Sequence, residues 1–262
     1  MSRWRPSAAD LAQHARARAD VSGFLDRPSL NELIFKLGVE QSDRVLERES
    51  GYASCRAGNW KIGVDSSEIS QRQMFTLAHE LGHVLYPGRG EDWTESTREE
   101  GWCNRFAAEL LMPRALVCSR FRNPQPSLEA AVILATCASV SLTSAFIRLD
   151  ELLGWNSALL GFRADGQRWR MISAVGLPKQ AMIALIPDLA LSEIVSTPVR
   201  RPKRVSLPFR VRGEFALVKS ELHGARAFRW ALVSKDIFSG RYEEQRSQAG
   251  RLDANSGSHE QS

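Results

Sequence analysis

The sequence predicts an α+β protein in two parts, a mainly helical first domain with a small β-hairpin or sheet and a small α+β domain after it. Two observations lead to this prediction. Segments bounded by helix start and stop signals dominate the chain up to about residue 153. After Gly154 and Trp155, short alternating segments separated by turn residues take their place. We therefore place the first domain at residues 1–153, the second at 156–239 and a disordered tail at 240–262.

The first domain is predicted to contain six helices and one β-hairpin. The helices are expected at residues 8–19, 29–37, 71–85, 98–111, 127–138 and 141–152. Gly38 follows the second helix in the position of a C-cap, and Ser70 and Gln73 have the spacing of a capping box at the start of the third. The pair Gly58-Asn59 lies between two alternating segments and indicates the turn of the hairpin.

The second domain is predicted to hold two hairpins, one turning at Asp165-Gly166 and the other near His223-Gly224. A short helical stretch is expected between them, at residues 178–195. The segment 198–212 has six basic residues and no acidic one, which permits a contact with nucleic acid. Its only aromatic residue is Phe209, however, so a solvated loop is the better interpretation of this segment. We find no catalytic or metal-binding motif in the second domain.

The composition is that of a soluble globular protein, with 43% hydrophobic and 25% charged residues over 262 positions. No apolar run approaches the roughly 20 residues needed to cross a bilayer, and the N-terminus lacks the apolar core of a secretory signal. We therefore expect a cytoplasmic protein with no membrane contact. The four cysteines are scattered without a C-x-x-C pair, so we expect free, mostly buried thiols.

The main chemical signal is His79-Glu80-x-x-His83, within the helix predicted at residues 71–85. Residues four apart on a helix lie one turn apart on the same face, so both histidines can bind one metal ion. Glu80 lies about 100° around the helix from His79, where it can accept a proton from a water molecule beside the ion. The apolar residues form a separate stripe, so we expect the histidines to face a cleft. Two partly exposed surface histidines are the alternative, but chance produces this motif in well under about one chain in a hundred of this length.

A catalytic zinc ion needs a third protein ligand, with water in the fourth position. The longer motif H-E-x-x-H-x-x-G-x-x-H is excluded because Tyr86 and Arg89 stand at its glycine and third histidine. The alternative is one of the carboxylates that follow, namely Glu91, Asp92, Glu95, Glu99, Glu100 or Glu109. Glu99 follows Ser96 at the spacing of a capping box, which gives it a structural role. Glu100 is followed at one turn by Asn104 and then by small residues, and on this spacing it is only slightly favoured over Glu99.

Two segments of the chain resemble a known family. "RQMFTLAHELGHVLYPG" and "EGWCNRFAAELLMP" are similar to the motifs F-T-x-A-H-E-x-G-H and E-x-x-x-N-x-F-A-x-x-L-L-M-P of the ImmA/IrrE family of zinc metallo-endopeptidases. Weaker similarity extends over Ser29 to Leu153. The resemblance implies a zincin-like metallopeptidase domain with Glu80 as the catalytic glutamate. It also implies the ligands of a Zn²⁺ cofactor, which are His79, His83 and Glu100.

The resemblance further implies a protein substrate. Members of the family are implicated in cleaving DNA-binding repressors, which switches on mobile-element or stress genes, so the expected partner is a helix-turn-helix repressor. The rival interpretation is a non-catalytic metal-binding regulator or antitoxin-like interaction protein, which would have no need of Glu80. Within the site, Asn104 is the candidate to steady the carboxylate of Glu100. The second domain is expected to sense a signal or recruit a partner.

Overall fold

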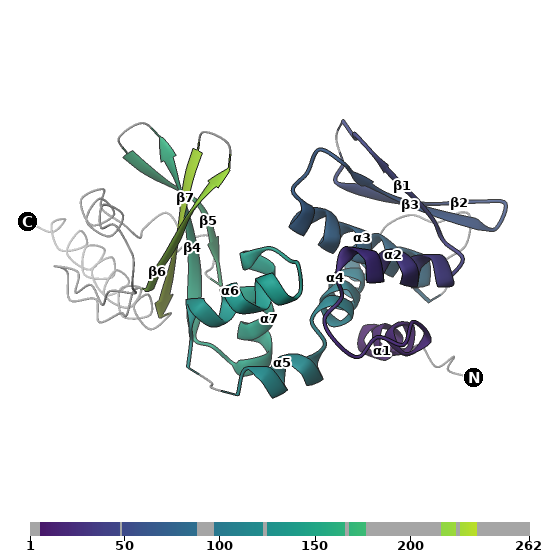
Figure 1. The fold of residues 1–262 in the computed structure, drawn as a ribbon, viewed down its shortest axis with the longest axis horizontal. Coiled ribbons are helices and arrows are strands. Elements are labelled where there is room, and N and C mark those ends of the chain that lie inside the picture. The colour runs from purple at the N-terminus through teal and green to yellow at the C-terminus, as the bar shows by residue number, and fades with distance from the viewer. Residues whose placement is uncertain are drawn as a thin grey trace, which may run out of the picture. The chain divides into compact units, whose positions relative to one another are not determined.

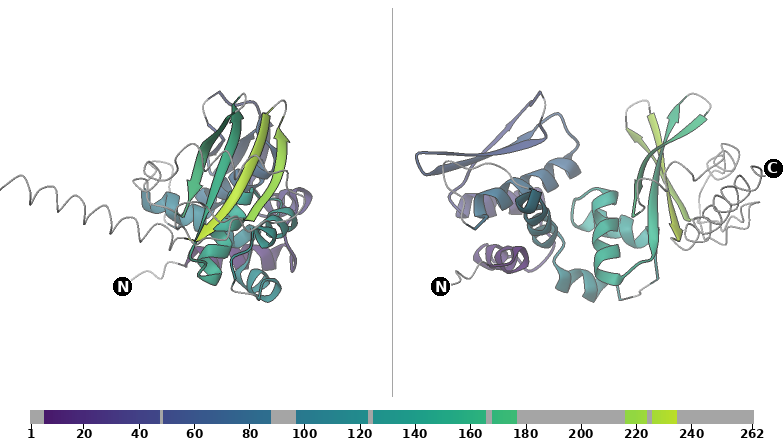
Figure 2. Two further views of the ribbon diagram at one scale, coloured as in Figure 1. Left: turned by 90° about the vertical axis from the view of Figure 1, so that its left-hand side faces the viewer. Right: turned by 180° about the vertical axis from the view of Figure 1, so that it is seen from behind.

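The computed structural model describes residues 6–47, 49–87, 97–122, 125–165, 168–176, 216–223 and 226–234. The chain divides into two compact units. Met1–Pro124 and Ala130–Leu153 make up the first unit, and Gln125–Glu129 and Gly154–Ser262 make up the second. Figures 1 and 2 show the helices and strands, whose mixture confirms the predicted α+β class.

Seven helices and three strands form the described chain up to Leu153. The helices are α1 (Ala8–Arg18), α2 (Arg27–Lys36), α3 (Ser70–Leu85), α4 (Thr97–Leu111), α5 (Arg114–Arg120), α6 (Leu128–Cys137) and α7 (Leu142–Leu153). The strands are β1 (Glu40–Arg44), β2 (Gly51–Arg56) and β3 (Asn59–Asp65). All six predicted helices are present, with ends that differ from the prediction by at most two residues. α5 and β1 are additional to the predicted elements.

The three strands form one sheet in the order β1-β3-β2, in which β1 is parallel and β2 antiparallel to β3. The hairpin of β2 and β3 turns at Ala57 and Gly58, whose φ angles are 50° and 78°. Positive φ at both central residues is the mark of a type I′ turn. The predicted turn is therefore wrong by one residue, because Asn59 already pairs with Arg56. α3 packs against β2 and β3 (Figure 1).

The start and end of α2 follow from its caps. The helix begins two residues before the predicted start because Asp26 is its N-cap, and the Asp26 carboxylate accepts a hydrogen bond from the backbone N–H of Ser29. Leu37 is the C-cap, and Gly38 comes next with a φ of 74°. Glycine is the residue that adopts this left-handed conformation without strain, which explains why the helix ends there.

The capping box predicted at the start of α3 is wrong. Ile69 is the N-cap and provides no side-chain hydrogen bond, and Ser70 is already helical. The side-chain amide of Gln73 donates instead to the backbone carbonyls of Ser66 and Glu68. Gln73 therefore satisfies polar groups of the preceding loop and ties the connection from β3 to the first turn of the helix.

Two buried arginines complete the C-terminal end of α4. Arg16 of α1 donates to the carbonyl of Leu110 at 2.7 Å, and Arg148 of α7 donates to the carbonyl of Met112 at 2.9 Å. The last carbonyls of a helix have no partner within the helix, so these contacts satisfy groups that burial would otherwise leave unpaired. Glu109, also buried, forms an ion pair with Arg148. These contacts hold the C-terminal end of α4, whereas Glu100, the predicted metal ligand on α4, lies near its N-terminal end.

The second unit contains a four-stranded antiparallel sheet in the order β5-β4-β7-β6 (Figure 2). Its strands are β4 (Ser157–Asp165), β5 (Arg168–Val175), β6 (Ala216–His223) and β7 (Arg226–Ser234). Asp165 pairs with Arg168 and His223 with Arg226, so both predicted hairpins are present. Asp165 and His223, predicted as turn residues, are instead the last paired residues of β4 and β6. The helix predicted at 178–195, the basic segment 198–212 and the tail 240–262 lie outside the described residues.

No single helix among the described residues has both the length and the apolarity of a membrane span, although α6 and α7, bent by 114° at their junction, reach those values as a pair. The four cysteines are free, as predicted. Only Cys103 is buried, while Cys55, Cys118 and Cys137 are half-buried, so the prediction of mostly buried thiols is wrong. The chain therefore carries three thiols that are partly accessible to solvent.

Candidate metal centre

Helices α3 and α4 supply the candidate site, and a glycine sets how closely they approach. A Cβ atom added to Gly82 of α3 would lie 3.2 Å from both Cα and Cβ of Cys103 and 3.2 Å from Cδ1 of Phe106, all on α4. Contacts between carbon atoms are most favourable at about 3.5–4.0 Å. A side chain at position 82 would therefore force the helices apart, and its absence lets α4 lie against the face of α3 that carries the histidines.

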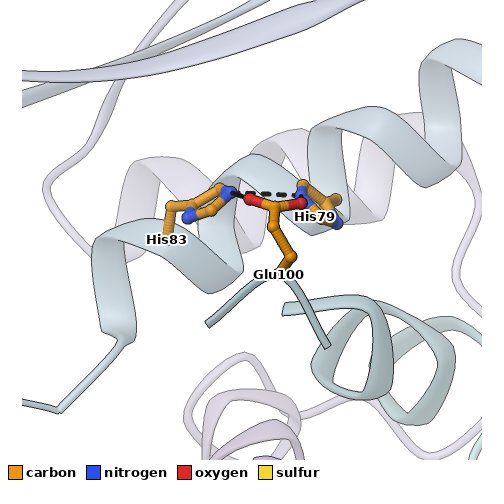
Figure 3. A group of neighbouring side chains, drawn as sticks. All are labelled: His79, His83 and Glu100. Carbon is orange, nitrogen blue, oxygen red and sulfur yellow. Dashed lines mark hydrogen bonds and ion pairs between the residues drawn. The ribbon is translucent and has the colours of Figure 1, made fainter. Parts of the chain in front are cut away.

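Three side chains from these helices point their donor atoms at one another (Figure 3). The Nε2 atoms of His79 and His83 are 3.1 Å apart. One carboxylate oxygen of Glu100 lies 3.1 Å from Nε2 of His83, and the other lies 3.4 Å from Nε2 of His79. Two imidazole nitrogens and a carboxylate oxygen thus converge on a space that could hold a metal ion.

The three side chains differ in their exposure to solvent. The side chains of His79 and His83 are 15% and 3% exposed, whereas that of Glu100 is 40% exposed. The prediction that both histidines face a cleft therefore fits His79 better than His83, which is buried. Burial lowers the pKa of His79, as does the nearby His83, while Glu100 and Asn104 act in the opposite direction. The lowered pKa of His79 favours the neutral ring, the form in which imidazole binds a metal.

The other ring nitrogens of the two histidines have partners on α4. Nδ1 of His79 lies 3.0 Å from Oδ1 of Asn104, and Nδ1 of His83 lies 2.8 Å from Oε1 of Glu99. The expectation that Asn104 steadies Glu100 is therefore wrong, since its amide contacts His79. The role predicted for Glu99 is a capping box with Ser96, but Ser96 lies outside the described part of the chain. The carboxylate of Glu99 contacts His83. Their positions on α4 gave no sign of these contacts, because the sequence does not show how α3 and α4 face each other.

Glu80 lies beside the group without being part of it. It is 8% exposed and sits under the first residue of β2. A Cβ atom added to Gly51 would lie 3.1 Å from Cγ of Glu80 and would also collide with the side chain of Thr76. The backbone of β2 at Gly51 therefore lies close to Glu80 and Thr76 of α3, which restricts the positions that the Glu80 side chain can take.

The remaining candidate ligands have other surroundings. Glu109 is paired with Arg148, and its Oε1 accepts a hydrogen bond from the backbone N–H of Arg114. Glu91, Asp92 and Glu95 lie outside the described residues. A second group of potential ligands consists of His83, Glu99 and Cys103, all buried, whose donor atoms lie within 4.8 Å of one another. It shares His83 with the first group but uses the opposite side of the ring.

The chain is similar to proteins that are already known. The radiation response metalloproteases IrrE of Deinococcus radiodurans and Deinococcus deserti are 35% and 38% identical to the chain over alignments of 100 positions, and each alignment covers 34% of this chain. The matched residues cover 30% and 36% of those proteins, so the chain spans about a third of the length of these curated relatives. A Mycobacterium tuberculosis transcriptional regulator shares the fold, with a TM-score of 0.50 and 14% identity over 87% of each chain.

The family comparison covers the candidate site itself. A peptidase family described as the IrrE N-terminal-like domain matches residues 29–150, which include α3, α4 and all the side chains of the candidate site. These limits agree closely with the resemblance found over Ser29 to Leu153. The match over residues 29–150 and the two Deinococcus relatives support the resemblance of this part of the chain to the ImmA/IrrE family.

Proposed function

We propose that the protein is a zinc-dependent endopeptidase that cleaves a peptide bond in a partner protein. In this proposal His79, His83 and Glu100 bind the zinc ion and Glu80 is the catalytic base. The observation that carries it is the convergence of two Nε2 atoms and one carboxylate on a single space, with a second, buried carboxylate on the adjacent residue of α3. Two histidines and a glutamate form one of the ligand sets found in catalytic zinc sites.

The distances between the donor atoms fit an ion with the bond lengths of zinc. With zinc–ligand bonds of about 2.0–2.1 Å, the ligand atoms of a tetrahedral site stand about 3.3 Å from one another. The separations here are 3.1, 3.1 and 3.4 Å. The exposure of Glu100, at 40%, leaves the site reachable from one side, as a water molecule and a substrate require.

The proposed chemistry assigns one task to each group. When bound, zinc supplies a Lewis acid that activates water near neutral pH and polarises the carbonyl group of the substrate. Glu80 accepts the proton of the attacking water and returns it to the amine that leaves. Because Glu80 is buried and lies close to Gly51 of β2, its side chain has few positions to choose from and loses little freedom when it reacts.

A helix-turn-helix repressor is the substrate that we propose. The support is the family resemblance and the two Deinococcus relatives, which are named as radiation response metalloproteases. We further propose that the second domain senses a signal or recruits the repressor, and that the protein acts in the cytoplasm. A direct contact of segment 198–212 with nucleic acid stays a prediction from its charge alone.

The alternative is a metal-binding regulator without catalytic activity. It would require the same ligands, but it gives no reason for a carboxylate at position 80. A carboxylate directly after the first histidine is the group that a proton-transfer role requires, so Glu80 favours the enzyme.

The proposal is tested by incubating the purified protein with the repressor encoded nearest to its gene. We expect one defined cut in the repressor, which appears when zinc is present and disappears when a chelator removes it. An intact repressor in both conditions, with zinc bound to the protein, would favour the non-catalytic regulator.

A further inference from the structure

The two proposed histidine ligands use different ring nitrogens for different purposes. Both Nε2 atoms face the shared space, and both Nδ1 atoms point to side chains of α4. A neutral imidazole has one protonated nitrogen and one nitrogen with a free lone pair. For Nε2 to bind a metal, Nδ1 must carry the proton, so a group that accepts a hydrogen bond from Nδ1 decides whether the ring can serve as a ligand.

Glu99 is such an acceptor for His83. Its Oε1 lies 2.8 Å from Nδ1 of His83, and the side chains of the two residues are only 2% and 3% exposed. An ionised carboxylate can only accept hydrogen bonds, so it selects the ring form in which Nδ1 is the donor. Because the pair is buried, water does not compete for this hydrogen bond.

The second ligand has a weaker partner of the same kind. Nδ1 of His79 faces the neutral amide oxygen of Asn104 at 3.0 Å. A hydrogen bond to an ionised acceptor is roughly twice as strong as one between neutral groups. The orientation of His83 should therefore depend on its α4 partner more strongly than the orientation of His79 does.

Helix α4 thus supplies both a proposed metal ligand and a hydrogen-bond partner for His83. Glu99 and Glu100 are consecutive, and residues that follow each other on a helix project about 100° apart. Glu100 reaches the Nε2 side of the histidines, while Glu99 reaches the opposite side of the His83 ring. The close contact between Gly82 and Cys103 keeps α4 near enough for both.

We infer that Glu99 is a positioning residue that fixes the ring form and orientation of His83 and thereby raises the affinity of the site for its metal. The inference rests on the proposed metal site, and it holds whether the protein is an enzyme or a regulator. Removing a hydrogen-bond partner of a metal-bound histidine typically lowers metal affinity about 10–100-fold. We expect a loss in this range for Glu99→Ala, and smaller losses for Glu99→Gln, which keeps an acceptor but no charge, and for Asn104→Ala, which removes a neutral acceptor.

The test uses the full-length protein and two measurements. Zinc affinity is measured by competition with a chromophoric chelator for the parent and the three variants. Nitrogen-15 NMR of labelled histidine in the zinc-free protein, above neutral pH, reports which nitrogen of His83 carries the proton. We expect protonated Nδ1 in the parent and in Glu99→Gln, and its loss in Glu99→Ala. If Glu99→Ala does not fold, Glu99→Gln alone must still show weakened zinc binding.

Three results would overturn the inference. One is parental zinc affinity in Glu99→Gln and Glu99→Ala, and another is an unchanged His83 ring form in Glu99→Ala. The third concerns the buried group of His83, Glu99 and Cys103. If Co²⁺ added to the parent produced a thiolate charge-transfer band that Cys103→Ser abolishes, Nδ1 of His83 would be the ligating atom. Loss of cleavage in Glu80→Gln with unchanged zinc affinity tests the proposed enzyme separately, because Glu80 is not among the ligands.

Discussion

Replacing Gly82 with alanine should destabilise the protein and weaken the metal centre, although alanine favours helices more than glycine does. In an exposed helix the change gains about 1 kcal/mol, because glycine loses more backbone freedom on folding. At position 82 the new Cβ would stand 3.2 Å from Cα and Cβ of Cys103 and from Phe106 on the facing helix. The Phe106 ring can turn, but the Cα atom of Cys103 moves only with the backbone of α4.

The change in stability of Gly82→Ala is the sum of the gain in helix propensity and the cost of the close contact. Overpacking of a well-packed contact costs about 1–3 kcal/mol, so Gly82→Ala should be destabilised by about 0–2 kcal/mol after the gain in helix propensity. Displacement of α4 should also move Glu100 away from the histidines. Gly101→Ala is the matched control, because a Cβ there meets only the end of the Arg105 side chain at 3.8 Å. The control should be stabilised by up to about 1 kcal/mol.

The assay is urea unfolding of the zinc-free protein followed by helix content, together with zinc affinity from competition with a chelator. We expect Gly82→Ala to be less stable than Gly101→Ala by about 1–3 kcal/mol and to bind zinc more weakly than the parent. If Gly82→Ala is as stable as Gly101→Ala and retains the parental zinc affinity, then the close contact between α3 and α4 does not hold the site together, and the reasoning is refuted.

Three further predictions concern other parts of the first unit. Glu109→Gln should lower the free energy of unfolding by about 3 kcal/mol, because it leaves the buried Arg148 without its buried ion-pair partner. Glu151→Gln, which changes the half-exposed partner of Arg148, should lower the free energy of unfolding by at most about 1 kcal/mol. Equal effects of the two variants in urea unfolding would contradict this prediction. Gly51→Ala should displace Glu80, because the new Cβ would lie 3.1 Å from Cγ of Glu80. The displacement should reduce cleavage on the order of 10²-fold. The zinc content, measured by atomic absorption, should stay at the parental level. Removing zinc with a chelator should lower the thermal midpoint of unfolding, because an ion present at 100 times its Kd stabilises the folded protein by about 2.7 kcal/mol. An unchanged midpoint would show that the folded protein holds no ion.

The local part of the candidate site could be predicted from the sequence. His79 and His83 are four residues apart on one helix, so helix geometry alone places them together. Glu100 needed the family resemblance, because spacing barely separated it from Glu99. The structure shows why, since both glutamates contact a histidine and only the side of the ring differs. That difference depends on how α4 is rotated against α3, which no pattern within a single helix reveals.

The missed elements have similar causes. β1, Glu40–Arg44, is polar along its whole length and mostly exposed, so it shows no alternation of apolar residues. It forms a strand because its backbone pairs with β3, from Glu40 opposite Lys61 onward. α5, Arg114–Arg120, has seven residues, too few to show a helical period. Both elements are determined by contacts with the rest of the unit rather than by their own sequences.

The most direct test of the central claim is to measure zinc content and repressor cleavage together for the parent and for Glu80→Gln. Glu80 is buried beside the proposed ligands but is not one of them, so Glu80→Gln should bind one zinc ion as the parent does. The amide cannot accept a proton from water, so cleavage should fall by about 10²–10⁴-fold. His83→Ala, the control, should lose zinc and cleavage together. Cleavage by Glu80→Gln at the parental rate would contradict the proposed mechanism.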